Sequence, residues 1–258
     1  MAKRRLIVSL LYRDGVIIQS RQFSHTNVVG SMKIAIEFFN VWEADEIVIL
    51  NVSRTDSGFE RFVRDVAEVS RQSFLPLSVG GWLTDMTRVR ALFDHGADKV
   101  IVNTRLFDDS RFANDVTGIY GSQALVASID AKLEAGRHMV YVDRGRRATG
   151  LDAVAWAKEV ARLGAGEIFL TSIDQDGEKD GYDLELMRAV SQAVDIPVVA
   201  FGGIQDFADM AHCLASTRID AVAAGNVFHF FEQSTRKAKN ELLRSGVDTR
   251  VPNNYFKY

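Results

Sequence analysis

Eight short apolar runs, each followed by a longer stretch with helical spacing, constrain the fold of this chain more than any other feature. The runs are nearly continuous rather than alternating, as in parallel strands that are covered on both faces. Eight βα units in 258 residues fit a closed barrel better than an open sheet. We therefore expect an α/β protein with one domain over residues 1–258, a single (β/α)₈ TIM barrel. The expected strands are Leu6–Leu11, Glu46–Asn51, Pro76–Gly80, Lys99–Asn103, Leu125–Asp130, Glu167–Ser172, Pro197–Phe201 and Ala221–Gly225, and helical spacing is clearest in Phe59–Arg71, Met86–His95 and Leu184–Val194.

Three motifs recur in the same order about half a chain apart. The recurrence predicts two similar halves of four βα units each, with two-fold internal pseudo-symmetry and a related site in each half. Chance similarity between apolar strands is the alternative, and the matched order of three motifs disfavours it. The pairs are Ala44–Ile47 with Ala165–Ile168, Val79–Gly81 with Phe201–Gly203, and Ala97–Thr104 with Ile219–Asn226.

Composition excludes several classes of protein. A net charge of −3 gives no basic field, so we do not expect nucleic acid as a partner. No apolar run reaches the roughly 18 residues of a membrane span. Cys213 is the one cysteine, so no internal disulfide can form, and we expect a cytoplasmic protein. Without spaced clusters of Cys and His, we expect no metal and no other cofactor.

Glycine pairs mark the ends of the third and seventh expected strands. Active sites of such barrels lie at the C-terminal strand ends, where glycine lets the backbone approach an anion. A single glycine pair is as often a tight turn, but two symmetric copies favour two facing phosphate cradles and a substrate with a phosphate at each end. The expected phosphate-binding residues are Gly81, Asn103, Thr104, Asp176, Gly177, Gly202, Gly203, Gly225 and Asn226.

Several longer motifs resemble those of the cyclase subunit of imidazole glycerol phosphate synthase, and the resemblance covers nearly the whole chain. They are Gly121–Ala124 with Ala127–Lys132, Gly164–Gly177, Gly181–Asp183 and Val227–Phe230. That family closes an imidazole ring with ammonia, which passes through the barrel from a glutaminase subunit docked on the N-terminal face. The family's substrate carries two phosphates, in agreement with the two cradles.

At the mouth of the barrel the sequence departs from the family. The resemblance implies two catalytic aspartates, at the ends of the first and fifth strands. Asp130 matches the second, where a strand end suits proton transfer, and a helix-capping aspartate is the alternative. Leu11 stands in place of the first and cannot transfer a proton. Gln19, Asn51 and Trp82 replace a lysine, an aspartate and a glycine, so we expect a different substrate or a mouth that no longer performs the cyclisation.

The opposite end matches the family. Arg5, Glu46, Lys99 and Glu167 match the ring of four charges that gates ammonia, and each stands at the start of an expected strand. Asp98 matches a position at the glutaminase interface. Mutual salt bridges would satisfy such a ring and narrow the barrel axis, although a purely structural plug would do the same.

The chain has an intact gate at one end of the barrel and an altered mouth at the other. In this it resembles a second group of such barrels, found with a glutaminase in bacterial surface-polysaccharide gene clusters. That resemblance implies a lyase-type synthase subunit that receives ammonia from a glutaminase, binds a phosphorylated substrate, and supports amidation of a nucleotide-linked N-acetyl sugar by a sugar amidotransferase. An authentic cyclase of histidine biosynthesis is one alternative. A non-catalytic scaffold of an amidotransferase complex is another.

One segment is longer than a βα loop needs. Within Lys132–Asp152, the run His138–Asp143 followed by Arg144–Arg147 predicts a hairpin. Its three arginines lie near the expected mouth. They would bind an acidic substrate or partner there, unless they form an ordinary solvated face.

Overall fold

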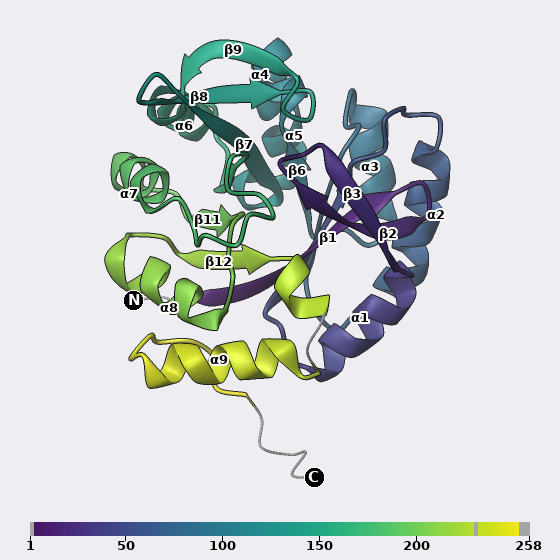
Figure 1. Ribbon diagram of the computed structural model, residues 1–258. Coiled ribbons are helices and arrows are strands. Elements are labelled where there is room, and N and C mark those ends of the chain that lie inside the picture. Colours follow the sequence, from purple (N-terminus) through teal and green to yellow (C-terminus); the bar gives the residue numbers. More distant parts are fainter. Residues whose placement is uncertain (1–2, 230–231, 253–258) are drawn as a thin grey trace.

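The computed structural model describes residues 3–229 and 232–252, and Phe230 of the last family motif lies outside them (Figure 1). Within those residues eight parallel strands close into a barrel, because β7 pairs with β10 and β1 pairs with β12. The expected (β/α)₈ barrel is confirmed. Its strands are β1 (Arg5–Arg13), β4 (Glu46–Asn51), β5 (Leu77–Gly80), β6 (Lys99–Val102), β7 (Leu125–Glu134), β10 (Glu167–Ser172), β11 (Val198–Phe201) and β12 (Ala221–Ala224).

β6 and β12 each end one residue earlier than expected, and four other strands depart from their expected bounds for two reasons. β5 and β11 begin one residue after Pro76 and Pro197, because proline has no N–H to donate to the ladder. The proline carbonyls still accept, from Ile47 N at 3.0 Å and Ile168 N at 2.9 Å. β1 and β7 run beyond their expected ends because each leaves the barrel and continues as an antiparallel ladder.

These two ladders give the barrel its pseudo-symmetry. β1 pairs with β2 (Val16–Arg21), which pairs with β3 (His25–Gly30). In the second half β7 pairs with β8 (Arg137–Val142), which pairs with β9 (Arg147–Asp152). The expected two-fold repeat and the hairpin within Lys132–Asp152 are therefore confirmed, and the first half carries a matching hairpin whose strand β3 is largely exposed.

Helices surround the strands (Figure 1). The three helices whose spacing was clearest in the sequence each end within one residue of the expected position. Aspartates cap several helices, as Asp85 does by accepting from the backbone N–H groups of Thr87 and Arg88. Within the described residues, no helix is long and apolar enough to cross a membrane. The helices are α1 (Met32–Val41), α2 (Phe59–Ser70), α3 (Met86–Asp94), α4 (Thr104–Asp108), α5 (Arg111–Tyr120), α6 (Ala153–Arg162), α7 (Leu184–Ala193), α8 (Phe207–Ser216) and α9 (Ser234–Arg244), with 3₁₀ turns at Ser122–Ala124 and Asn226–His229.

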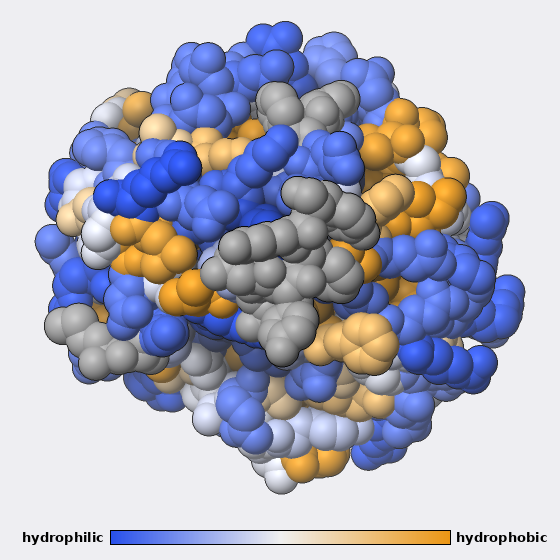
Figure 2. Space-filling view, turned by 90° about the horizontal axis from the view of Figure 1, so that it is seen from below, coloured by the Kyte–Doolittle hydropathy of each residue, from blue (hydrophilic) through white to orange (hydrophobic). Residues whose placement is uncertain are grey.

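The core has two layers because successive strand residues point to opposite faces. One apolar layer packs between strands and helices and includes Cys213, which is fully buried on α8. A smaller cluster fills the barrel interior and includes Ile7, Val126, Phe169 and Phe201. The face in Figure 2 is mainly hydrophilic, with its apolar groups in separate areas, as amphipathic surface helices predict.

Candidate active-site cavity and axial ion ring

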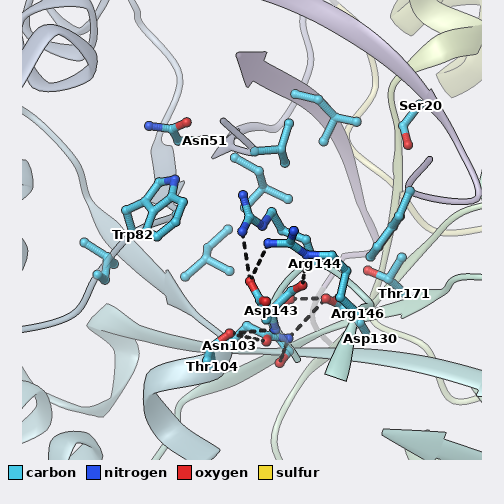
Figure 3. Close-up of a pocket in the computed structure, with 18 of the residues that line it drawn as sticks. Ser20, Asn51, Trp82, Asn103, Thr104, Asp130, Asp143, Arg144, Arg146 and Thr171 are labelled. Atoms are coloured by element: carbon cyan, nitrogen blue, oxygen red, sulfur yellow. Dashed lines mark hydrogen bonds and ion pairs between the residues drawn. The ribbon is translucent and has the colours of Figure 1, made fainter. Parts of the chain in front are cut away.

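A cavity of about 650 Å³ opens at the C-terminal ends of the barrel strands (Figure 3). Its size falls in the range of small-molecule sites, and its place is where barrel enzymes hold substrate. Inward-facing side chains of six strands line it. They are Leu11, Leu50, Ile101, Ser128, Asp130, Thr171 and Phe201.

The cavity has two chemically different walls. Leu11 lies beside Leu50 in the β1–β4 pairing, and Asp130 lies beside Thr171 at the matching step of the β7–β10 pairing. The first half therefore presents apolar groups where the second half presents polar ones. Figure 3 shows Trp82 on the side of the cavity opposite Thr171.

Asp130 is the candidate proton-transfer group of the polar wall. Its side chain accepts from Asn103 Nδ2 at 3.1 Å and from Ser128 Oγ at 3.3 Å. Burial raises the pKa of Asp130 to about 7, against hydrogen bonds from Ser128 and Thr171 that favour the charged form. Asp130 lies where β7 leaves the barrel, within the strand rather than at its end, and it caps no helix. Such a carboxyl can gain or lose a proton near neutral pH.

The β8–β9 tip, residues Asp143–Arg146, covers the expected cradle of the first half. Thr104 Oγ1 accepts from Asp143 N at 2.9 Å. Arg144 donates to Ser53 O at 2.7 Å, and its guanidinium lies 4.9 Å from the centre of the Trp82 ring. Thr104, expected to bind phosphate, thus holds a loop of the other half.

Trp82 keeps the backbone that a glycine would favour. Its φ of +59° lies in the left-handed region, which side chains other than glycine rarely adopt. The indole Nε1 donates to Ser53 O at 3.0 Å. A Cβ on the preceding Gly81 would lie 2.2 Å from Asn51 O, so this loop packs closely on the end of β4.

The β2–β3 tip, residues Ser20–Ser24, covers the expected cradle of the second half in the same way. Asp176 is buried, and its carboxylate accepts from Ser20 Oγ at 2.7 Å and Phe23 N at 3.2 Å. A Cβ on Gly177 would lie 2.5 Å from Ser20 O, and Asn226 Nδ2 donates to the same carbonyl at 3.3 Å. Each hairpin tip therefore closes on the opposite half of the barrel.

The residues expected to bind phosphate divide into two sets. Gly81, Asn103 and Thr104 line the cavity. The other six are not among its lining residues; they are Asp176, Gly177, Gly202, Gly203, Gly225 and Asn226. Sequence reasoning passed over Leu50 and Thr171 in the lining, although the repeat that aligns Glu46 with Glu167 also aligns these two.

Arginines gather on the rim. The three expected from the hairpin are engaged within the chain: Arg144 and Arg146 both pair with Asp143 (Figure 3), and Arg147 pairs with Asp108 at 2.6 Å. Among the described residues, no group of three or more His, Cys, Asp or Glu side chains is placed to hold a metal ion.

The four expected gate residues form a closed ring at the N-terminal end of the barrel. Arg5 pairs with Glu46 at 2.8 Å and with Glu167, and Lys99 pairs with Glu46 at 3.2 Å and Glu167 at 2.8 Å. Both glutamates are buried. Burial alone would raise the pKa of Glu167, but attraction by Arg5 and Lys99 outweighs it and lowers that pKa. The ring is therefore charged and internally neutral, as alternating ion pairs require.

Two aromatic rings lie between this ion ring and the mouth. Phe169 follows Glu167 by two residues on β10, so both side chains face the axis. The Phe201 ring packs on Phe169 with centroids 5.2 Å apart, and Phe201 also lines the mouth cavity. Both residues are buried. A small molecule that travels the axis must displace these rings.

Asp98 lies beside the ion ring on the N-terminal face. Its carboxylate accepts from Leu77 N at 2.8 Å. Asp98 also lines a second cavity, of about 460 Å³, together with Pro76 and Phe74, and the Phe74 side chain is 92% exposed.

Comparison with known proteins places the chain among barrels of one pathway. The family model described as histidine biosynthesis protein matches residues 5–234. The chain is 38% identical over 251 residues to imidazole glycerol phosphate synthase subunit HisF of Chlorobium phaeobacteroides (strain BS1), covering 97% of this chain and all of that protein. The identity and coverage are the same for the HisF subunit of Chlorobium luteolum (strain DSM 273 / BCRC 81028 / 2530).

Proposed function

The chain belongs to the histidine biosynthesis protein family, and we propose that it accepts ammonia from a glutaminase subunit at its N-terminal face and passes it along the barrel axis to the mouth. The closed ring of Arg5, Glu46, Lys99 and Glu167 carries this proposal. A ring of balanced charges at the axis binds cations and anions poorly but offers a neutral molecule hydrogen bonds on entry. The aromatic pair above it excludes water, which keeps ammonia from being protonated and lost.

The mouth supports a reaction other than the cyclisation performed by the HisF relatives. Leu11 gives that wall no group able to transfer a proton. Of the three aspartates that line the cavity, Asp108 and Asp143 are paired with arginines, which leaves Asp130 in a position to do so. We propose that the barrel holds a phosphorylated ligand there while a sugar amidotransferase activates a nucleotide-linked N-acetyl sugar. The chain then acts as ammonia conduit and docking platform in surface-polysaccharide synthesis.

An authentic imidazole glycerol phosphate synthase cyclase is the second candidate. Asp130 favours it, because a carboxyl whose pKa is raised to about 7 can act alternately as acid and base at neutral pH. Asn103 Nδ2 would orient that carboxyl through its 3.1 Å hydrogen bond. This candidate requires one aspartate to do the work of two. A non-catalytic scaffold is the third, and the hairpin tips that cover both cradles favour it.

Binding to a HisH-type glutaminase from the same organism tests the proposal. The full chain should form a complex and raise the rate of glutamine hydrolysis. Asp98→Arg should weaken the complex by roughly tenfold or more, because it places a positive charge at the docking face. Asp108→Arg, at the opposite face, is the matched control and should leave binding unchanged. No complex and no change in glutamine hydrolysis would overturn the proposal.

A further inference from the structure

We propose that the outer surface formed by β3 and α1 binds a second copy of this chain. In the dimer, β3 of one copy pairs antiparallel with β3 of the other across a two-fold axis, and the apolar side chains beside it are covered. This inference goes beyond the proposed function and does not depend on it. The surface, called the apolar patch below, has five side chains that are 40–62% exposed: Val28 and Val29 of β3, and Ile34, Phe38 and Val41 of α1.

β3 offers an unpaired strand edge. Within the described residues it pairs with β2 and with no other strand (Figure 1). That pairing is regular from His25 to Val28 and shifts beyond Val28, so these four residues form the straight part of the edge. β3 contains no Lys, Arg, Asp, Glu or Pro, the residues with which natural sheets block pairing at an edge. An open edge without charge is a template for another strand.

The corresponding edge of the second half is protected. β9 is the outer strand of the second hairpin, as β3 is of the first. It begins with Arg147 and ends with Asp152, and both side chains are ion-paired within the chain. Charges at both ends of a strand oppose the addition of another strand. The two hairpins therefore share their topology but differ in whether their edge can pair.

α1 continues the apolar patch as a stripe. Ile34, Phe38 and Val41 follow one another at helical spacing, so they share one face of the helix. The Phe38 ring lies 5.1 Å from the ring of Trp42, which holds it in place on that face. The stripe begins four residues after β3 ends, so strand and helix form one continuous surface.

α6, the corresponding helix of the second half, is polar at the same positions. In the repeat that relates the two halves, Glu159 takes the place of Phe38, and Arg162 takes the place of Val41. Glu159 and Arg162 form a surface salt bridge at 2.7 Å. The barrel therefore folds without apolar residues at these positions, and the stripe on α1 indicates a contact beyond the single chain.

The size and the symmetry of the patch favour a second copy as its occupant. Five side chains with this exposure present roughly 400–500 Å² of apolar surface, which is as large as the largest patch of a typical monomer. Two facing patches and the added strand would bury about 1,000 Å² in total, at the low end for a specific interface. A two-fold axis places β3 against itself, and an uncharged strand meets no like charge there. We expect a weak dimer with a Kd on the order of 10 µM.

Sedimentation velocity of the full chain from about 1 to about 200 µM tests this inference, since the range spans the expected Kd. The average mass should rise from that of the monomer towards that of the dimer. Hydrogen exchange of the β3 amides should slow several-fold between the two ends of the range, because the second copy covers them. A chain that stays monomeric throughout overturns the inference. A dimer without slower exchange in β3 overturns the strand pairing.

Matched variants locate the contact. Phe38→Glu combined with Val41→Arg copies the residues of α6 onto α1, and Val28→Lys adds a charge to the edge of β3. Each should weaken dimerisation about tenfold or more without changing the urea midpoint, since the side chains are exposed. Ile119→Lys is the control, because Ile119 is an equally exposed apolar residue on α5, outside the patch. Equal effects in variants and control contradict the inference.

Glutaminase binding separates this inference from the proposed function. The double variant on α1 should bind the glutaminase as the wild type does while failing to dimerise. If it dimerises normally but loses the glutaminase, the apolar patch belongs to that partner, and the inference is overturned. Failure of the wild type to dimerise leaves the ammonia proposal standing, because that proposal depends on the opposite measurement, the complex with the glutaminase.

Discussion

Leu11 and Asp130 occupy equivalent positions in the two halves of the barrel, and both line the cavity at its mouth. The two residues lie beside Leu50 and Thr171, which are also equivalent. A symmetric scaffold thus carries an asymmetric site, with a carboxyl at only one of these two equivalent positions. The predictions below concern this carboxyl, the ion ring, the axis and the hairpin that covers the mouth.

Asp130 should make the protein less stable as the pH rises. Its pKa is raised from 3.8 to about 7 by burial, so the folded state favours the protonated form and loses stability as the pH rises through that range. Three pKa units correspond to at most about 4 kcal/mol. Asp130→Asn should therefore gain stability over the wild type at about pH 8, and little at about pH 4. Urea unfolding at the two pH values measures this, and an equal effect at both would contradict it.

Each charged residue of the ion ring should contribute to the stability of the folded protein. Lys99→Met leaves two buried glutamates to share Arg5, and removing one partner of a buried pair costs about 3–5 kcal/mol. Lys33→Met breaks the exposed pair with Glu68 and should cost about 1 kcal/mol or less. Urea unfolding of the two variants at neutral pH compares them. Similar losses would show that the ring is not held by its charges.

Phe201 should contribute to stability through the axial pair. Phe201→Ala removes a buried ring from its contact with Phe169 and should cost about 3–5 kcal/mol. Phe74→Ala, at a side chain that is 92% exposed, should change the free energy of unfolding by about 0.5 kcal/mol or less. Chemical denaturation measures both. A small loss for Phe201→Ala would mean that the axis tolerates an opening there.

His138 should stabilise the β8–β9 hairpin in acid. Its Nε2 lies 2.9 Å from Asp183 Oδ2 at the start of α7, and this hydrogen bond raises the pKa of His138 above 6.5. The stabilisation that this pair gives the folded state is complete below pH 6.5, and it is lost as the pH rises through the raised pKa of His138. His138→Gln should cost roughly 1 kcal/mol at about pH 5.5 and less at about pH 9. Thermal unfolding at both values measures this, with the exposed His25→Gln as control.

Apolar patterning predicted the barrel but not the loops that close its mouth. Runs such as Glu46–Asn51 and Glu167–Ser172 are apolar because both strand faces are covered, so the strands could be found one by one. β3 is largely exposed and carries no such run, so this strand could not be found in the same way.

At the candidate site, prediction from the sequence was limited in a different way. Asp176 and Thr104 were identified as phosphate ligands from residue type and position, and that role stays a prediction. In the structure their side chains hold Ser20 and Asp143, each more than 35 positions away in sequence. Contacts between the tip of one half and the loop of the other depend on the closed barrel, which no local pattern specifies. The four residues Arg5, Glu46, Lys99 and Glu167 were identified by resemblance to the family, and each begins a strand in the structure.

The central claim is that this barrel no longer performs the cyclisation of the HisF relatives. Steady-state turnover of the substrate of imidazole glycerol phosphate synthase, with ammonium salts as nitrogen source, tests it most directly in wild type and Leu11→Asp. We predict no turnover by the wild type, whether or not Leu11→Asp restores some. Wild-type turnover at an ordinary enzyme rate, about 1 s⁻¹ or more, would contradict the account and show that Asp130 suffices alone.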